Sequence, residues 1–214
     1  MVTLAEDLYV LAINGSNGRL LIDNARLDPG LGGALLLDLA LRGHVGLVES
    51  HVVVTTGPPT GDQLLDAALA DITGEPKRHG PDHWVHHLGR GAHRAVQDQL
   101  VDAGVLRRDD DRLLRVIPMH RTHEIDGRLH HQLQEHLEDS VVLGHPPSQE
   151  TAALAALALA VGLERHLFPR SDRREIRRRM AEIAEGGWVA PAVAGAVTVV
   201  DVALGLVPAA EPLE

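Results

Sequence analysis

The stretch GLGGALLLDLALRG, residues 30–43, decides how the rest of the chain is interpreted. It is an apolar run that contains one acid, Asp38, and it ends in Arg42-Gly43, which is typical of the end of a helix. Asp28-Pro29 stands just before it, as an N-cap residue followed by a proline at the first helical position. We therefore predict an apolar helix that starts at Asp28-Pro29 and ends at Gly43.

Capping patterns and turn residues predict further elements on both sides of this helix. Thr3-x-x-Glu6 is a capping box that opens a helix over residues 4–13, and Thr60-x-x-Gln63 is a second one that opens a helix to about residue 72. Residues 44–54 are predicted to form a β-hairpin around Glu49-Ser50, and residues 19–22 a short strand. Further helices are expected over 81–88, 92–103 and 125–139 and from residues 148, 171 and 191, with a second hairpin over 105–117.

The composition favours packed helices. The chain has 214 residues, of which 44% are hydrophobic but only 2% aromatic, so its core must be built from Leu, Ala and Val. The absence of cysteine excludes disulfides and thiolate metal sites. The apolar segments 151–163 and 189–207 are expected to be buried core helices, because the longer one contains Pro191 and Asp201. We predict a soluble, mainly helical protein with two or three small hairpins.

The charge is acidic overall but unevenly distributed. The formal net charge is −10, yet residues 76–135 hold nine acids, ten bases and nine of the fourteen histidines. A face that binds an anion is therefore expected in this middle third. The alternative is compositional drift, because Arg outnumbers Lys nineteen to one.

Two clusters of residues in the middle third are candidates for a metal site and for a phosphate site. His83, His86 and His87 share a helix face, but the zinc-protease pattern needs a glutamate that the segment lacks, so we predict no metal site, no cofactor and no catalytic residue. Arg90, His93 and Arg94 fall at positions i, i+3 and i+4, where they can hold phosphate. The competing interpretation of these three residues is an ordinary solvated helix face.

Four blocks, taken together and in order, resemble the Golgi phosphoprotein 3 family. They are Thr3-Leu4-Ala5-Glu6-Asp7-Leu8, the stretch from Gly30 to Gly43, Pro59-Thr60-Gly61-Asp62-Gln63-Leu64-Leu65-Asp66, and Leu100-Val101-Asp102-Ala103-Gly104-Val105-Leu106. The resemblance implies a single domain over residues 1–214, with packed helices around a central helical bundle, one protruding β-hairpin and a C-terminal tail at 208–214. It also implies a non-catalytic peripheral membrane protein that binds phosphatidylinositol 4-phosphate and the cytosolic tails of other proteins.

The lipid site of the family transfers only in part. Gly32 stands at the position of one lipid-contacting arginine and Asp23 near that of the tryptophan, whereas Arg90 and His93 match the pair on the later helix. With Arg94, these two residues form the predicted headgroup site.

In the family, the protruding hairpin contributes to membrane contact and to oligomer formation. Its counterpart here carries Arg107, Arg108, Leu113 and Leu114 around the acidic turn Asp109-Asp110-Asp111. That turn would be repelled by anionic headgroups.

Three functional hypotheses follow. The first is a cytoplasmic protein, peripheral at the cytosolic membrane face, that binds an anionic phospholipid headgroup. The second is a DNA-binding regulator of winged-helix type, which the charge of −10 disfavours. The third is an interaction module that forms a homo-oligomer through the hairpin, without lipid.

Overall fold

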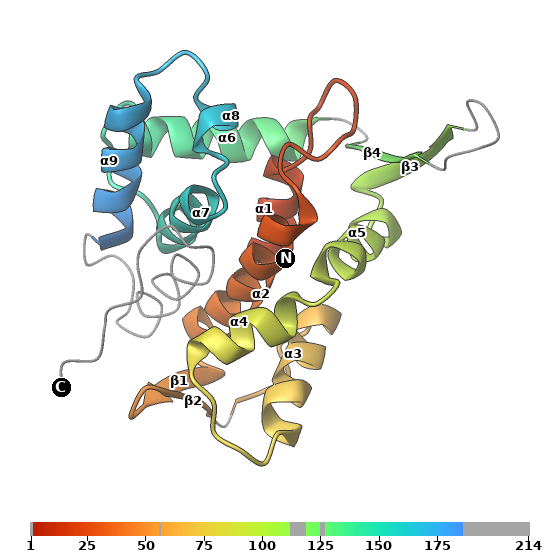
Figure 1. Cartoon of the computed structure of the whole chain (residues 1–214), viewed down its shortest axis with the longest axis vertical. Coiled ribbons are helices and arrows are strands. Elements are labelled where there is room, and N and C mark those ends of the chain that lie inside the picture. The colour runs from red at the N-terminus through yellow and green to blue at the C-terminus, as the bar shows by residue number, and fades with distance from the viewer. Residues whose placement is uncertain (1, 56, 112–118, 125–126, 186–214) are drawn as a thin grey trace.

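A long apolar helix, α2 (Asn24–Leu41), runs through the centre of the protein (Figure 1). The computed structural model describes residues 2–55, 57–111, 119–124 and 127–185. Almost every residue of α2 from Leu27 to Leu39 is buried, and the helix contacts α1, α3, α4, α5 and α7. A helix that is apolar on all sides is stable only when other helices surround it, which is the arrangement seen here.

Helix α1 lies beside α2 in this centre, α3 to α5 lie on one side of the two, and α6 to α9 lie on the other (Figure 1). Their bounds are α1 (Leu4–Leu11), α3 (Gln63–Gly74), α4 (Pro81–Gly89), α5 (Ala92–Asp102), α6 (Arg128–Val141), α7 (Gln149–Ala160), α8 (Glu164–Leu167) and α9 (Arg173–Glu185). The prediction of a mainly helical protein is confirmed. Among the described helices, none combines the length and apolar character that crossing a bilayer requires.

Helix α4 packs on α2 at very short range because both helices carry glycine at the crossing. A Cβ atom on Gly32 would lie 2.1 Å from the Val85 carbonyl oxygen, and one on Gly89 would lie 2.6 Å from the Asp28 carbonyl oxygen. Both positions therefore have to be glycine if the helices are to keep this separation.

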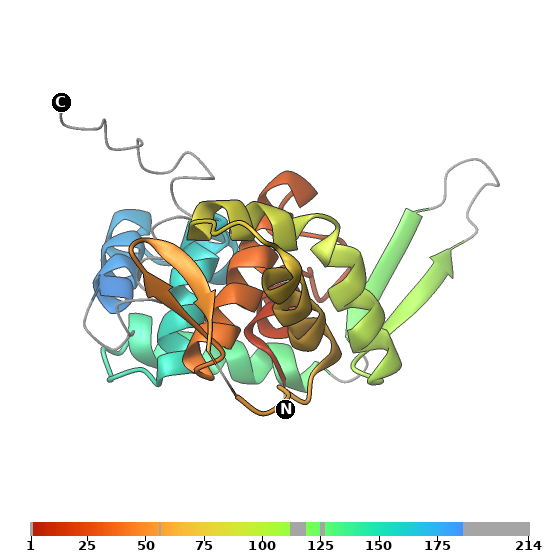
Figure 2. The same cartoon turned by 90° about the horizontal axis from the view of Figure 1, so that it is seen from below.

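The described strands form two antiparallel pairs. β1 (Val45–Val48) pairs with β2 (His51–Val54) through the turn Glu49-Ser50, whose φ angles of 50° and 62° are those of a two-residue hairpin turn. β3 (Leu106–Asp111) follows α5 and pairs with β4 (Met119–Glu124). The second pair projects from the helical body (Figure 2).

The first hairpin is confirmed, but the predicted limits of the second were wrong. Its returning strand ends at Glu124, beyond the predicted limit of residue 117, and Asp109–Asp111 belong to β3 rather than to a turn. The register places Asp109 opposite Arg121 and Asp110 opposite His120. Leu113, Leu114 and the predicted helix from residue 191 lie outside the described residues.

Two helix starts also differ from the prediction. Helix α2 begins five residues before Pro29, because the Asp23 side chain accepts a hydrogen bond from the Arg26 amide and caps it there. Helix α3 is capped by Asp62, which accepts from the amides of Leu64 and Leu65, while Thr60 bonds to Asp66 instead. The predicted strand at 19–22 is reduced to one bridge between Ile13 and Leu20.

Candidate functional site

A cavity of about 600 Å³ lies between α1, the connection from α1 to α2, and α5. We call it the α5 pocket. Its wall mixes apolar surface with amide and cationic groups, and the residues that line it are Tyr9, Ile13, Gly18, Leu20, Asn24, His93, Arg94, Gln97, Asp98 and Arg108. Two of the three residues predicted to hold a headgroup, His93 and Arg94, are therefore in one cavity.

His93 is held in place by an acid from α2. Its Nδ1 lies 2.7 Å from the Asp28 Oδ1, and its backbone N–H donates to the same oxygen at 3.0 Å. The other ring nitrogen, Nε2, is 3.5 Å from the side-chain amide nitrogen of Asn24, which lines the pocket. The imidazole ring of His93 is thus held by Asp28 through Nδ1, and its Nε2 lies on the pocket side.

Arg94 is the cation of the pocket that is available to a ligand. Within the described ranges, its guanidinium forms no hydrogen bond or ion pair, and the side chain is exposed. It stands in the first turn of α5, where the N-cap residue Gly91 has no side chain and the Asp28 carboxylate accepts from the His93 backbone N–H instead. Asp28 therefore offsets the positive end of the helix dipole, and the attraction for an anion comes from Arg94 itself.

The hairpin contributes one arginine to this pocket. Arg108 of β3 lines it and forms an ion pair with Asp98 of α5. Because Asp98 is itself exposed, a phosphate entering the pocket would compete with this carboxylate for Arg108. Arg107, the other predicted hairpin cation, is exposed on β3 and does not line the pocket.

Arg90 lies outside the α5 pocket. It lines a separate groove of about 170 Å³ between α3 and the α4–α5 junction, with a floor of leucine and alanine. Its guanidinium is 2.5 Å from His87 Nδ1, and His87 Nε2 is 3.4 Å from Asp71 of α3. The structure therefore separates Arg90 from His93 and Arg94, although the three are close in sequence.

The two positions at which the family's lipid contacts are replaced have structural roles. Asp23 caps α2, and Gly32 lies in the α2–α4 crossing, where no side chain fits. The sequence did not indicate that Asn24 and Asp28 lie next to His93. The contact between Asp28 and His93 spans 65 residues, so no local pattern could have predicted it.

The histidines of α4 do not form a metal site in the described part of the chain, where no group of three or more metal-binding side chains converges. Instead the rings of His79 and His83 stack with centroids 3.7 Å apart, and His87 continues the stack at 5.8 Å from His83. The edge of the stack meets the buried ring of Trp84. Parallel stacked rings cannot direct their nitrogens at a common ion, because a metal lies in the plane of each imidazole that binds it.

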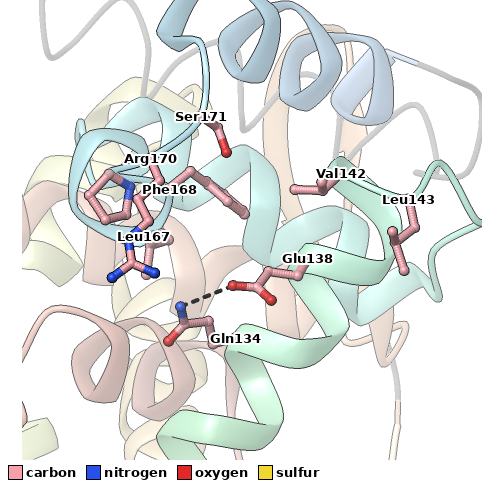
Figure 3. A pocket seen from close by; sticks show the side chains of 9 residues that line it. Gln134, Glu138, Val142, Leu143, Leu167, Phe168, Arg170 and Ser171 are labelled. Carbon is pink, nitrogen blue, oxygen red and sulfur yellow. Dashed lines mark hydrogen bonds between the residues drawn. The ribbon is translucent and has the colours of Figure 1, made fainter.

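A third cavity, of about 500 Å³, lies where the end of α6 meets the connection from α8 to α9 (Figure 3). Val142, Leu143 and Phe168 give it an apolar side, and Gln134 donates to Glu138 across its floor. Val142 and Leu143 are 52% and 67% exposed. None of the predicted site residues lies in this cavity.

The fold and the α5 pocket define a helical protein with a cationic surface cavity and a projecting hairpin. Residues 4–200 match the family model described as Golgi phosphoprotein 3 (GPP34), and the chain belongs to this family. The match covers nearly the whole chain, and it includes all the elements that build the α5 pocket. The resemblance inferred from the four sequence blocks is thereby confirmed.

Proposed function

We propose that this protein is a non-catalytic, peripheral membrane adaptor that binds phosphate-bearing lipid headgroups in the α5 pocket. The observation that carries the proposal is Arg94, a cation without a protein partner in the described chain, at the N-terminus of α5 in a cavity that also holds His93 and Arg108. Membership of the Golgi phosphoprotein 3 family supports lipid or protein interaction in general. Within this class, phosphatidylinositol 4-phosphate on the cytosolic face is the lipid that we would test first.

The chemistry of the pocket suits phosphate. A guanidinium donates two parallel hydrogen bonds to phosphate oxygens, and charge-assisted bonds of this kind are about twice as strong as neutral ones. The amides of Asn24 and Gln97 add neutral donors. The net charge of −10 opposes approach to an anionic surface, so attraction has to be local and short-ranged.

Co-flotation with vesicles tests this proposal. We expect binding to phosphatidylcholine vesicles that contain phosphatidylinositol 4-phosphate and none to phosphatidylcholine alone. Arg94→Ala should weaken binding about tenfold, because it removes a charge-assisted contact with the phosphate. Binding that does not depend on the anionic lipid would contradict the proposal.

Arg90→Ala is the matched variant. It removes the same side chain four residues away, from the groove beside α3 instead of the α5 pocket. If the α5 pocket is the site, Arg90→Ala binds like the unmodified protein. Loss of binding in Arg90→Ala with normal binding in Arg94→Ala would move the site to the α3 groove.

A second candidate function is self-association through the projecting hairpin. In the described chain, β4 is hydrogen-bonded to β3 and has no strand on its other side. An unpaired strand edge can add a strand from a second copy or a protein tail. This function is compatible with headgroup binding.

A further inference from the structure

The contact between Asp28 and His93 fixes which nitrogen of the imidazole carries a proton. An ionised carboxylate only accepts hydrogen bonds, so the nitrogen 2.7 Å from Asp28 Oδ1 has to be Nδ1–H. A second hydrogen bond, from the His93 backbone N–H to the same oxygen, fixes the position of the Asp28 carboxylate relative to His93. Both side chains are mostly buried, with 17% and 23% of their surfaces exposed.

This geometry leaves Nε2 as the atom that a ligand meets. In the neutral ring Nε2 is an acceptor with a lone pair, and it would repel a phosphate oxygen. In the protonated ring Nε2–H is a donor and the ring is positive. Asn24, 3.5 Å away, can turn its amide to suit either form. His93 can thus help to bind an anion only after the ring has taken up a proton.

The charges around the ring oppose each other. Asp28 of α2 favours a positive ring, whereas Arg94 of α5 and Arg108 of β3 line the same cavity and disfavour it. Asp98 offsets Arg108 by an ion pair, and Tyr9 of α1 is the remaining titratable group of the wall. A phosphate in the cavity adds negative charge beside the ring and shifts this balance toward protonation.

We propose that the α5 pocket is a proton-linked anion site, in which Asp28 positions His93 so that phosphate and a proton bind together. The inference rests on the proposed function and adds a regulation to it, namely tighter headgroup binding in mildly acidic than in neutral medium. The linkage between proton binding and headgroup binding is reciprocal. If one proton is taken up when the headgroup binds, the affinity for the headgroup therefore changes by up to about tenfold per pH unit.

The probe has to keep its own charge constant. A phosphate monoester loses charge near pH 6, which would work against the expected change. Phosphatidylglycerol in phosphatidylcholine vesicles is a suitable probe, because its phosphodiester stays singly charged throughout this range. Soluble glycerophosphoglycerol, the same headgroup without acyl chains, distinguishes a site for free phosphodiester from one that requires a lipid surface.

The experiment measures binding of the full chain to both probes at pH 5.5 and pH 7.5. We expect the unmodified protein to bind at least fivefold more tightly at the lower pH, within the limit for one proton. His93→Arg keeps a cation at both pH values and should bind about equally at both. Asp28→Asn, a change in a positioning residue, should weaken binding at pH 5.5, because the carboxylate that orients the His93 ring is lost. Thermal unfolding of each variant checks that it is folded.

His86→Arg is the matched control for His93→Arg. It makes the same replacement on the exposed face of α4, outside the α5 pocket. It should therefore retain the pH dependence of the unmodified protein, including the part that arises because other surface histidines become charged. The difference between the two variants isolates the contribution of His93.

Each outcome decides one of the two claims. Binding of the unmodified protein that is equal at both pH values, or a pH dependence that persists in His93→Arg, overturns the proton linkage and leaves headgroup binding intact. No binding of either probe or of phosphatidylinositol 4-phosphate vesicles at either pH overturns the proposed function, and the linkage with it. Binding of glycerophosphoglycerol that is as tight as that of vesicles, and tighter at pH 5.5 than at pH 7.5, supports the linkage and assigns the ligand to free phosphodiester.

Discussion

At the scale of single residues, Asp7 of α1 is a partly buried acid without a compensating contact at one of its oxygens in the described chain. Its Oδ1 is buried and has no hydrogen-bond partner there. Burial, followed by the nearby charges of Glu6 and Asp38, raises the pKa of Asp7 to about 7. Unlike Asp7, the two neighbouring acids have hydrogen-bond donors. Glu6 accepts from the Thr3 and Gln99 side chains. Asp38 accepts from the Leu4 amide and from Arg42.

Asp7→Asn is expected to stabilise the protein at alkaline pH. The folded state holds the Asp7 proton more tightly than the unfolded state, so the cost of ionisation is absent below the unfolded pKa of 3.8, grows as the pH rises, and is complete above about 7. Removal of the charge should raise the free energy of unfolding by roughly 2–3 kcal/mol at pH 8. At pH 4 it should have almost no effect. Urea denaturation at both pH values measures the difference.

Glu150→Gln is the control for this prediction. Glu150 is an exposed acid in the first turn of α7, so its replacement should change stability by only a few tenths of a kcal/mol, about equally at both pH values. An Asp7→Asn variant that behaves like Glu150→Gln would mean that Asp7 is ionised at neutral pH without a cost.

At the scale of helices, the α2–α4 crossing depends on Gly32. A methyl group there would meet the Val85 carbonyl oxygen and the Gly89 backbone, neither of which can move without moving α4. We expect Gly32→Ala to lower the free energy of unfolding by about 3 kcal/mol, as overpacking against backbone does. Thermal or urea unfolding measures this.

Gly74→Ala provides the comparison for Gly32→Ala. It makes the same replacement at the last residue of α3, where the new Cβ has open space around it. It should be neutral or slightly stabilising, because alanine favours helix more than glycine does. Equal stability of the two variants would show that α4 can shift away from α2 at little cost.

Much of this element-level structure could be predicted from the sequence, because most helices carry their own local signals. The apolar run of α2 and the helices α4 and α5 follow from caps, periodicity and terminal glycines. The start of α2 could not be predicted in the same way. Asp23 and Asp28 are both plausible N-caps, and Asp28 is instead used by His93, which is remote in sequence.

The candidate site was predictable to a similar extent. The spacing of His93 and Arg94 identified two residues of the α5 pocket, because both lie in the first turn of one helix. The same spacing suggested that Arg90 joins them. However, Arg90 is the C-cap of α4, and the break between α4 and α5 turns it toward α3. Helical spacing predicts a shared face only within a single helix.

At the scale of the whole molecule, the β3–β4 hairpin is the part that projects furthest from the helical body in the described chain (Figure 2). It contacts the body mainly through α5, at the base of β3. A two-stranded hairpin by itself is marginally stable in water, and a third strand or a packed face stabilises it. In a twofold dimer, β4 of one copy would pair with β4 of the other and satisfy both edges.

We therefore predict that the protein forms dimers through this hairpin and that shortening it gives a monomer. The variant replaces residues 109–121 by Asn-Gly, which closes a two-residue turn on the pair Arg108 and Thr122 and keeps the ion pair with Asp98. Light scattering over a range of concentrations should show a mass that rises toward two chains for the intact protein and stays at one for the variant. As a control, replacing Glu49-Ser50 by Asn-Gly puts the same turn into the β1–β2 hairpin and should leave the dimer unchanged, since both residues already have positive φ. A dimer that survives shortening would place the interface on the helical body, and one mass for all three proteins at a single chain would refute self-association.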